Sequence, residues 1–484
     1  MSSIGENEIK DIVKEVLANL SINKGLLISS GGDNHFEPKP SGSNGIFEKM
    51  DEAINAASVA FIELNKATLD KRKKYIQAIR QHALSATVHA AKLAVEETGM
   101  GRPEDKIEKN KLAILKTPGV EDLQTEAFTG DKGLTLQERA PYGVIGSISP
   151  STNPTETVFN NSIMMISAGN TVVFNPHPAA RKCSLLAVET INKAIQSCGG
   201  PANCATAVLQ PTLDSGRTLF THPKIKLLCV TGGPAVVEEA MKSSKKTVAA
   251  GPGNPPVVVD ETANIDKAAA SIITGASLDN NVLCIAEKEI FVIDSVADKL
   301  KSAMKKNNGY EISLNQLDKL MTKIISKMPE KEGEEAVVNR NFVGRNANVI
   351  ARELGLNLPD STRLLFADVP NDHPLIYIEQ LMPVMPLSRV RNFDKALELS
   401  YKAEHNYFHT AMMHSLNIDR LTQMGKLMNV SIFVKNGPSC AGLGYGGEGY
   451  TTFTIASPTG DGITRPRTFT RMRRCSMIDY LRII

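Results

Sequence analysis

The chain lacks the features that would place it in a membrane, on nucleic acid or in the secretory pathway. None of its apolar runs reaches the roughly 18 residues that a helix needs to cross a bilayer. Its N-terminus has neither the basic flank nor the continuous apolar block of a secretory signal. A net charge of +3 over 484 residues gives no electrostatic reason to bind nucleic acid or a membrane surface. These absences predict a cytoplasmic protein with no nucleic acid and no membrane as a partner.

The cysteines also show no pattern that is typical of disulfide pairing. The seven cysteines are an odd number, include no CxxC pair and are scattered through the chain. This pattern favours reduced thiols over a disulfide framework. A hydrophobic content of 42% with 22% charged residues is typical of a soluble globular protein. The length suggests about three domains.

The first 20 residues form a self-contained amphipathic segment. A helix predicted over residues 1–20 carries six apolar side chains on one face, which are Ile9, Ile12, Val13, Val16, Leu17 and Leu20. A flexible linker rich in Gly, Ser, Asn and Pro follows at 21–45. The helix either docks on its own domain or a partner subunit, or is a docking peptide for another protein. A membrane-surface helix is disfavoured because acidic residues offset its lysines.

The rest of the chain predicts an α/β architecture. Residues 46–123 have helical spacing, interrupted at TGMGRPEDK. Beyond Pro141, short apolar runs alternate with helical segments, and the runs are VIGSIS, TVVF, ATAVL, IKLLCV and VVVD. Such alternation predicts an open, mostly parallel sheet. The turns SPSTNP, NPHP, TGGP and AGPGNPP should lie at strand ends and outline one ligand crevice. A second α/β unit is expected from about residue 260 to 436.

Two motifs that would indicate ligands are incomplete. Gly442, Gly444 and Gly447 satisfy GxGxxG, but the following YTTFTIA is expected to be a strand, whereas a dinucleotide fingerprint needs a helix there. His405 and His409 are four residues apart and would share one face of a helix. The full HExxH pattern is absent and no third ligand is placed by spacing, so no metal site is predicted.

A cysteine in the stretch DNNVLCIAEK is the candidate nucleophile. Alone, Cys284 is a weak signal, because a free cysteine often packs as a small hydrophobe. Its context comes from PYGVIGSISPSTNPTETVFNNSIMMISAGNTVVFNP, VTGGPAVVEEAM, AAGPGNPPVVVD, DNNVLCIAEK and EQLMPVMPLSRV. In order and spacing, these five motifs resemble the aldehyde dehydrogenase superfamily. More narrowly, they resemble its CoA-acylating branch, the propionaldehyde and acetaldehyde dehydrogenases of propanediol and ethanolamine breakdown. EDKIEKNK, TPGVEDL, FVKNGPS and GGEGYTTFTIA make the propanediol type the closer match.

The resemblance implies an aldehyde dehydrogenase-like fold and a homodimer or homotetramer. It also implies that Cys284 adds to a short-chain aldehyde, that hydride leaves to NAD, and that a thioester forms on the cysteine before coenzyme A (CoA) takes the acyl group. The implied domains are a Rossmann-type cofactor domain at 46–255, an α/β catalytic domain at 256–440, and a return segment at 441–484 that forms a small oligomerisation arm with about 128–142.

One substitution bears on the acyl acceptor. In the hydrolytic branch the motif ELGGKSP supplies a glutamate that activates water, and Ala249 stands at that position here. Without this base, hydrolysis of the thioester should be slow and the CoA thiol should compete well. Three rival interpretations are a hydrolytic NAD-dependent aldehyde dehydrogenase that gives the carboxylic acid, a non-catalytic microcompartment lumen protein, and an acyltransferase without redox chemistry.

The resemblance also suggests the groups around the nucleophile. Strict counting places Thr152 where the family has its oxyanion-hole asparagine, with Asn153 one residue later. We expect Asn153 and the Cys284 backbone N–H to form the oxyanion hole, although Asn153 is equally placed to be a turn residue. Either His177 or His409 could deprotonate the CoA thiol, because histidine titrates near neutral pH. His409 is preferred, because FHTAMMH resembles an HTA segment of the family. A structural role for His409 remains open.

The nucleotide is expected at the strand-end turns. Glu379 matches the glutamate that holds the nicotinamide ribose, and Leu381 replaces an aromatic partner. Asn175 stands where hydrolytic members have a lysine that reaches the adenosine ribose. The other residues expected to bind the cofactor are Ser149, Pro150, Thr152, His177, Pro178, Thr231, Gly232, Gly233, Ala250 and Gly251.

The N-terminal helix has a counterpart in the same branch. Members that work in bacterial microcompartments carry a tethered amphipathic peptide that packages the enzyme. The resemblance therefore implies that residues 1–20 bind a shell protein and place the enzyme inside a microcompartment.

Overall fold

The computed structural model describes residues 36–42, 44–329 and 334–483. The helix predicted at 1–20 lies outside the described residues, as does most of the linker. No helix in the described part of the chain is both long and apolar enough to cross a bilayer.

Three helices follow one another in the segment predicted to be helical. The Thr68 side chain accepts a hydrogen bond from the Lys71 N–H at the start of α3, and the helix ends at Gly99 with a φ of 68°. This left-handed cap suits glycine, which has no Cβ. Pro103 then opens α4 at a position where no backbone N–H is needed. The bounds are α2 Met50–Leu64, α3 Leu69–Thr98, α4 Pro103–Lys116 and the short η2 Val120–Asp122.

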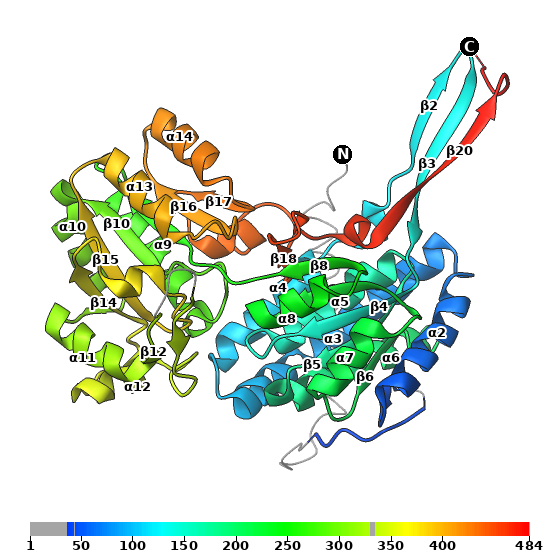
Figure 1. The fold of residues 1–484 in the computed structure, drawn as a ribbon, viewed down its shortest axis with the longest axis horizontal. Helices are drawn as coiled ribbons and strands as arrows, with labels where there is room; N and C mark the ends of the chain where they lie inside the picture. Colours follow the sequence, from blue (N-terminus) through cyan, green and yellow to red (C-terminus); the bar gives the residue numbers. More distant parts are fainter. Residues whose placement is uncertain (1–35, 43, 330–333, 484) are drawn as a thin grey trace, which may run out of the picture. The chain divides into compact units, whose positions relative to one another are not determined.

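The first sheet of the structure has six parallel strands in the order β1-β6-β5-β4-β7-β8 (Figure 1). Four of the five predicted apolar runs are strands of this sheet. Every residue of β5 is buried, as expected where helices cover both faces. The strands are β1 Ile46–Phe47, β4 Val144–Ser149, β5 Thr171–Pro176, β6 Ala205–Val208, β7 Ile225–Thr231 and β8 Lys246–Ala250.

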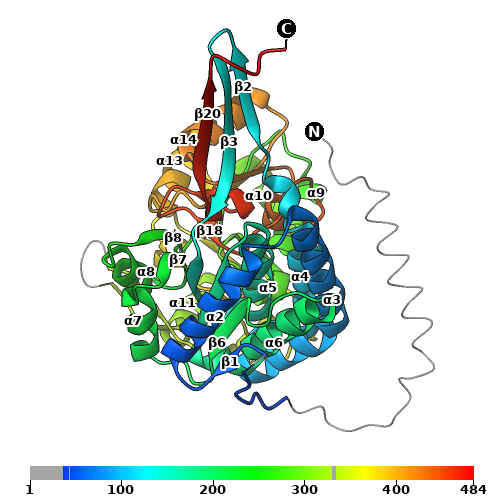
Figure 2. The same ribbon diagram turned by 90° about the vertical axis from the view of Figure 1, so that its right-hand side faces the viewer.

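Helices cover both faces of this sheet (Figure 2). Helices α2, α7 and α8 share one apolar cluster with the strands. Helices α3 to α6 pack against one another on the other face. The remaining bounds are α5 Pro154–Ser167, η3 Pro178–Ala180, α6 Arg181–Ser197, α7 Leu213–Thr221 and α8 Pro234–Met241.

The strand order reverses between β4 and β7. From β4 the chain moves outward through β5 and β6, and then returns to the other side of β4 with β7 and β8. Open parallel sheets bind ligands at such a reversal, beyond the carboxyl ends of the strands. The predicted turns SPSTNP, NPHP, TGGP and AGPGNPP follow β4, β5, β7 and β8, so all four reach this edge. The topology therefore brings the four turns to the edge where one crevice is predicted.

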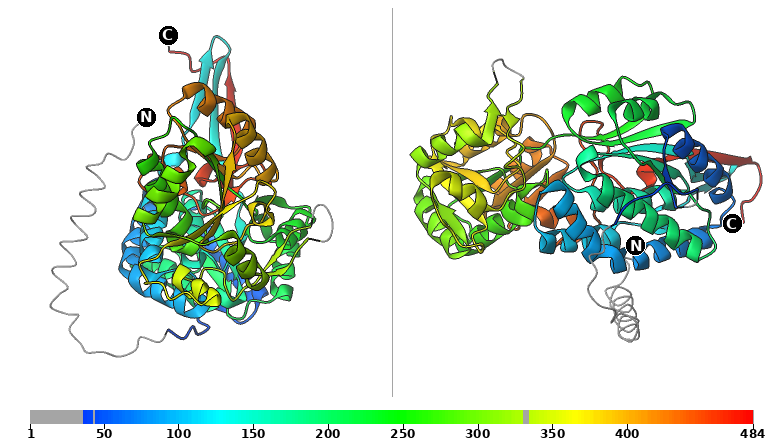
Figure 3. Two further views of the ribbon diagram at one scale, coloured as in Figure 1. Left: turned by 90° about the vertical axis from the view of Figure 1, so that its left-hand side faces the viewer. Right: turned by 90° about the horizontal axis from the view of Figure 1, so that it is seen from below.

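A second parallel sheet has seven strands in the order β11-β14-β15-β10-β9-β16-β17. The strand of this sheet that comes first along the chain, β9, corresponds to the fifth predicted apolar run, VVVD. Figure 3 shows the lobe with this sheet beside the lobe with the first sheet. The strands are β9 Pro256–Val259, β10 Glu289–Ile293, β11 Gly309–Glu311, β14 Leu364–Val369, β15 Val384–Val390, β16 Thr410–His414 and β17 Ile432–Lys435.

The helices of the second sheet also divide between its faces. Helices α9 and α10 share one apolar cluster with the strands, and α11 to α14 share another. A small hairpin, β12 Ile325–Lys327 with β13 Val337–Val338, lies outside the sheet. The helices are α9 Ile265–Ser277, η4 Leu278–Asn281, α10 Asp294–Lys306, α11 Leu314–Ile324, α12 Ala347–Ala351, η5 Arg352–Leu354, η6 Pro374–Tyr377, α13 Phe393–Ala403 and α14 Ile418–Met428.

A three-stranded antiparallel arm is built from β2 Glu126–Gly130, β3 Gly133–Pro141 and β20 Thr470–Ile478 (Figure 1). Most of its side chains are exposed or half-buried on both faces. The strands come from the two regions predicted to form the arm. The elements between β17 and β20 are η7 Ser439–Leu443, β18 Ile455–Ala456, β19 Gly462–Ile463 and η8 Pro466–Phe469.

One local prediction is wrong. Within YTTFTIA, only Ile455–Ala456 is a strand, because backbone N–H groups before it bond to side chains instead of a neighbouring strand; the Phe453 N–H, for example, donates to Asn160 Oδ1 at 2.9 Å. His405 and His409, whose spacing would have allowed one helix face, do not share a helix. They lie in the loop between α13 and β16, where His405 has a φ of 57°.

Candidate active site

Cys284 lies in the loop that joins α9 to β10, and buried polar groups hold this loop in place. Asp279, Asn280 and Asn281 all have positive φ, between 49° and 67°, which is uncommon for residues other than glycine. Asn281 Nδ2 donates to two backbone carbonyl oxygens at 2.7 and 3.0 Å. Lys288 is fully buried, and its Nζ donates to two carbonyl oxygens of the loop at 3.1 and 3.3 Å. The backbone that presents Cys284 is therefore supported by satisfied buried polar groups.

Three candidate residues converge on Gly253. A Cβ at this glycine would lie 2.7 Å from the Cys284 carbonyl oxygen and 3.0 Å from the His409 ring. The Gly253 N–H donates to Glu379 Oε1 at 3.3 Å. Only a residue without a side chain allows this approach. The structure thus brings together Cys284, His409 and Glu379, which are far apart in the sequence.

These groups gather at one edge of the second sheet. Gly253 precedes β9, Cys284 precedes β10, Glu379 precedes β15 and His409 precedes β16. The four strands are neighbours in the sheet, so their amino ends meet. The candidate chemistry therefore lies at amino ends of the second sheet, whereas the nucleotide turns lie at carboxyl ends of the first.

The electrostatics at Cys284 favour the neutral thiol. Burial and the nearby Glu379 carboxylate raise the pKa of the Cys284 thiol to about 12, although Lys288 opposes the shift. Burial raises the pKa of Glu379 to about 7. The Cys284 residue keeps partial contact with solvent. At neutral pH the unliganded enzyme therefore holds a thiol that must lose its proton as it attacks.

His409 is buried and neutral. Its Nδ1 lies 2.9 Å from Thr410 Oγ1, and its Nε2 has no hydrogen-bond partner within the described residues. Burial lowers the pKa of His409 to about 4, with a further contribution from Lys288. The expectation that His409 titrates near neutral pH is therefore wrong. Its loop is fixed by Glu404, whose Oε1 accepts a hydrogen bond from the His409 backbone N–H at 2.7 Å.

Asn153 comes to the site from the first sheet. It precedes α5, and its side chain makes no capping bond to that helix. Instead its Oδ1 accepts a hydrogen bond from Lys109 Nζ, and its Nδ2 donates to Thr152 Oγ1 at 3.2 Å. Lys109 also donates to Asp279 in the cysteine loop at 2.6 Å. Asn153 is therefore tied to the loop of Cys284 through a buried lysine.

This lysine cluster was absent from the residues predicted to form the site. Lys106 and Lys109 lie three residues apart on one face of α4 and are buried. Their spacing in EDKIEKNK was visible in the sequence. Paired lysines on a helix are usually exposed, however, and only the structure shows their carboxylate partners Asp279 and Glu156.

The turns of the first sheet have groups that suit a nucleotide. Ser149 is buried at the end of β4, and its Oγ has no hydrogen-bond partner within the described residues. Gly232 and Gly233 precede α8, and a Cβ at Gly233 would meet nothing within 4 Å. An open helix N-terminus of this kind suits a phosphate. Ser149 and the two glycines thus offer groups that suit a dinucleotide, whereas Thr152 Oγ1 accepts from Asn153 Nδ2 at 3.2 Å and Thr231 Oγ1 lies 3.0 Å from Thr454 Oγ1.

Other predicted cofactor residues are already engaged in the protein. Asn175 Oδ1 accepts a hydrogen bond from Ser215 Oγ at 2.6 Å, so its side chain is held against the start of α7. His177 Nδ1 accepts from the Ala179 N–H at 3.1 Å. The Leu381 carbonyl accepts from the Gly344 N–H at 2.9 Å, and Leu381 has a φ of 51°. Pro150 and Gly251 lie in the turns after β4 and β8, Pro178 begins η3 shortly after β5, and Ala250 is the last residue of β8.

Ala249 lies within strand β8. Its methyl group is fully buried in the apolar cluster shared with α2, α7 and α8. No carboxylate can therefore come from this position to activate water.

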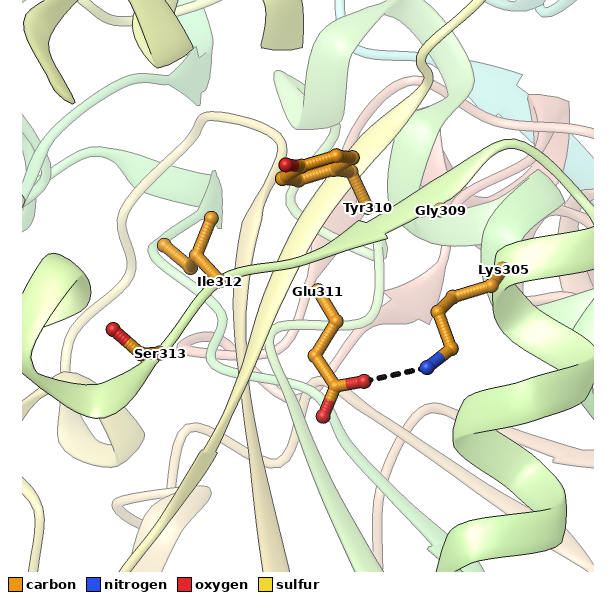
Figure 4. A pocket seen from close by; sticks show the side chains of 6 residues that line it. All are labelled: Lys305, Gly309, Tyr310, Glu311, Ile312 and Ser313. Carbon is orange, nitrogen blue, oxygen red and sulfur yellow. Dashed lines mark hydrogen bonds and ion pairs between the residues drawn. The ribbon is translucent and has the colours of Figure 1, made fainter. Parts of the chain in front are cut away.

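A surface pocket of about 600 Å³ lies elsewhere, beside edge strand β11 (Figure 4). Its charged side chains already pair, since Lys305 Nζ bonds to Glu311 at 2.8 Å. None of its lining residues belongs to the predicted site.

Comparison with known proteins defines the class. Residues 43–453 match the aldehyde dehydrogenase family. The chain belongs to this family.

Its similar relatives are acylating enzymes. Over 447 residues the chain is 50% identical to an acetaldehyde dehydrogenase (acetylating) of Bilophila wadsworthia, with 92% of each chain covered. It is 46% identical to a Rhodopseudomonas palustris propionaldehyde dehydrogenase solved with bound CoA and an acylated cysteine, at a TM-score of 0.87 over 90% of this chain and 99% of that chain. A propionaldehyde dehydrogenase from the fucose-utilisation microcompartment of Clostridium phytofermentans is 47% identical, at a TM-score of 0.88 over 91% of this chain and all of that chain.

Proposed function

We propose that the protein is a CoA-acylating aldehyde dehydrogenase, which converts a short-chain aldehyde, NAD⁺ and CoA to acyl-CoA and NADH. The observation that carries this is Cys284 on a fixed loop in a chain nearly half identical to acylating enzymes along its length. Identities of 50% to an acetaldehyde enzyme and 46% to a propionaldehyde enzyme support either aldehyde as substrate.

The first half of the reaction needs a nucleophile and a donor for the developing oxyanion. Cys284 Sγ forms a bond to the aldehyde carbon as the thiol proton leaves. The Asn153 amide and the Cys284 backbone N–H would hold the oxygen that becomes negative. Bound NAD⁺ would supply the acceptor for the hydride that leaves the aldehyde carbon, so that the carbonyl re-forms as a thioester on Cys284. The residues proposed to hold the nucleotide are those of the turns after β4 and β7, with Glu379.

The second half transfers the acyl group to CoA. The CoA sulfur attacks the thioester carbon, loses its proton, and Cys284 leaves as the thiolate. Glu379, with its pKa raised to about 7, has the proton affinity of a base at neutral pH. His409 would contribute as a neutral acceptor through its unpartnered Nε2. Ala249 supports CoA over water as the acyl acceptor, because it supplies no base.

The deciding experiment varies CoA. With aldehyde and NAD⁺ alone, we expect at most one NADH per subunit, because the acyl group stays on Cys284. Adding CoA should give continuous NADH formation and acyl-CoA in equal amounts, measured by absorbance and mass spectrometry. Sustained NADH with free acid and no CoA would show a hydrolytic enzyme. An acyltransferase would form neither NADH nor acyl-CoA from the aldehyde, but would transfer the acyl group of an added acyl thioester to CoA. No reaction with either substrate would favour a lumen protein.

We also propose that residues 1–20 are an encapsulation peptide and that the enzyme works inside a microcompartment. Support comes from the amphipathic pattern of this segment and from the microcompartment origin of one similar enzyme. Deleting residues 1–20 should leave kcat/KM unchanged but abolish co-purification with shells. A control that replaces only the linker at 21–35 with Gly and Ser should still co-purify. Packaging that survives the deletion would contradict the proposal.

The two sheets and the exposed arm support a domain assignment and an assembly. We propose that the first sheet is the cofactor domain, with boundaries near 46–255, and that the second sheet is the catalytic domain near 256–440. The arm exposes both faces, which suits a contact between copies in a homodimer or homotetramer.

A further inference from the structure

A buried charge cluster joins the two halves of the site. Lys106 and Lys109 on α4 face the carboxylates of Asp279 and Glu156. All four side chains are at most 2% exposed. Asp279 belongs to the cysteine loop and Glu156 to the first turn of α5, directly after Asn153. The cluster therefore touches both segments that would form the oxyanion hole.

Asp279 is the anchor of the cluster. Its Oδ2 accepts hydrogen bonds from Lys106 Nζ at 2.8 Å and from Lys109 Nζ at 2.6 Å. Its Oδ1 accepts one from the Arg102 N–H at 2.8 Å. A Cβ at Gly101 would lie 1.9 Å from Asp279 Oδ1, so the turn before α4 is built around this carboxylate. A buried carboxylate with three donors is held in one orientation.

Each of the two lysines that bind Asp279 also donates a hydrogen bond to the segment before α5. Lys106 Nζ donates to the Thr152 carbonyl oxygen at 3.0 Å. Lys109 Nζ donates to Asn153 Oδ1. An ammonium group can only donate hydrogen bonds, so only the oxygen of the Asn153 carboxamide can face it. The Asn153 amide nitrogen must then point away from Lys109, with one of its hydrogens free after the bond to Thr152 Oγ1.

We propose that Lys109, with Asp279 as its counterion, is a positioning residue that aims the Asn153 amide nitrogen at the oxyanion formed over Cys284. This inference rests on the proposed function. Lys109 and Asn153 are 44 positions apart, and Lys109 and Asp279 are 170 apart. The bridge couples a donor from the first lobe to the nucleophile loop of the second. Without it, the carboxamide is free to rotate and present its oxygen to a negative charge.

The test is a double-mutant cycle measured by CoA-dependent NADH formation. Lys109→Met keeps most of the side-chain volume but removes the donor and the charge. We expect kcat to fall about 100-fold, in the range of a lost oxyanion donor, while KM values for aldehyde and NAD⁺ stay within about threefold. Lys109→Gln retains a donor and should keep more kcat than the methionine variant. Lys111 lies on the same helix, exposed and paired with Glu108 on the surface, so Lys111→Met should match wild type.

The cycle separates positioning from general stability. In an Asn153→Ala background, Lys109→Met should cause no further loss of kcat, because the group that it positions is gone. A loss that multiplies with the Asn153→Ala loss would overturn the inference, as would a Lys109→Met enzyme that keeps more than a third of kcat. If Lys109→Met does not fold, the glutamine variant completes the same cycle. A wild-type enzyme that makes no NADH with CoA present would instead overturn the proposed function.

Discussion

Replacement of Cys284 by alanine should reduce kcat on the order of 10⁵-fold or more. Loss of a covalent nucleophile removes the whole two-step route, and comparable losses follow removal of other catalytic nucleophiles. The variant should still bind NAD⁺, because the turns that would hold the nucleotide belong to the other sheet. The measurement is NADH formation with aldehyde and CoA, beside nucleotide binding by calorimetry.

The control is Cys475→Ala on the exposed arm, which should keep full activity. Residual activity above about 1% in the Cys284→Ala variant would place the nucleophile elsewhere.

The raised thiol pKa adds a pH dependence to the same prediction. The Cys284 pKa is about 12. At pH values well below 12, the thiolate fraction of the unliganded enzyme increases about tenfold for each unit by which the pH is raised. Alkylation of Cys284 by iodoacetamide, followed by peptide mass spectrometry, should therefore accelerate about tenfold per unit from pH 7 to 9. A rate that levels off below pH 8 would show that the thiol ionises much more easily.

Replacement of Asn153 by alanine should lower kcat by 10²- to 10³-fold, the usual effect of removing one donor from an oxyanion hole. Stability should fall by about 1–3 kcal/mol, because the buried Lys109 ammonium loses one hydrogen-bond acceptor but keeps Asp279. Affinity for aldehyde and NAD⁺ should also change little, since the missing bond forms only as the oxygen becomes negative.

Asn153→Asp sharpens this prediction. The new carboxylate can keep the contact with Lys109, so a purely structural role for Asn153 would be rescued. An oxyanion-hole donor would not be, because the carboxylate has no N–H to offer. We expect Asn153→Asp to lose at least as much kcat as Asn153→Ala. Activity near wild type in the aspartate variant would remove Asn153 from the mechanism.

Much of the fold was predictable from local patterns. The break TGMGRPEDK appears as the Gly99 cap of α3 and the Pro103 start of α4. The apolar runs became parallel strands, and the strand order reverses between β4 and β7. These predictions succeeded because caps, helical periods and buried strands depend on residues that are close in sequence.

Predictions that depended on packing were less secure. YTTFTIA has the composition of a strand, but the N–H groups of Phe453 and Thr454 donate to the side chains of Asn160 and Thr452 instead of a neighbouring strand. His409 was expected to titrate near neutral pH, yet burial lowers its pKa to about 4. Burial and remote partners decide both outcomes, and neither is encoded in a short window.

The sequence by itself determined the nucleophile candidate Cys284, the family to which the chain belongs and the absence of a carboxylate at Ala249. Only the tertiary structure brought Gly253, Glu379 and His409 to Cys284 at the amino ends of four neighbouring strands. Only the structure revealed the bridge from Lys109 to Asp279 as well. The reason is that motifs record residue types along the chain, whereas hydrogen bonds, burial and pKa values depend on groups that folding brings together.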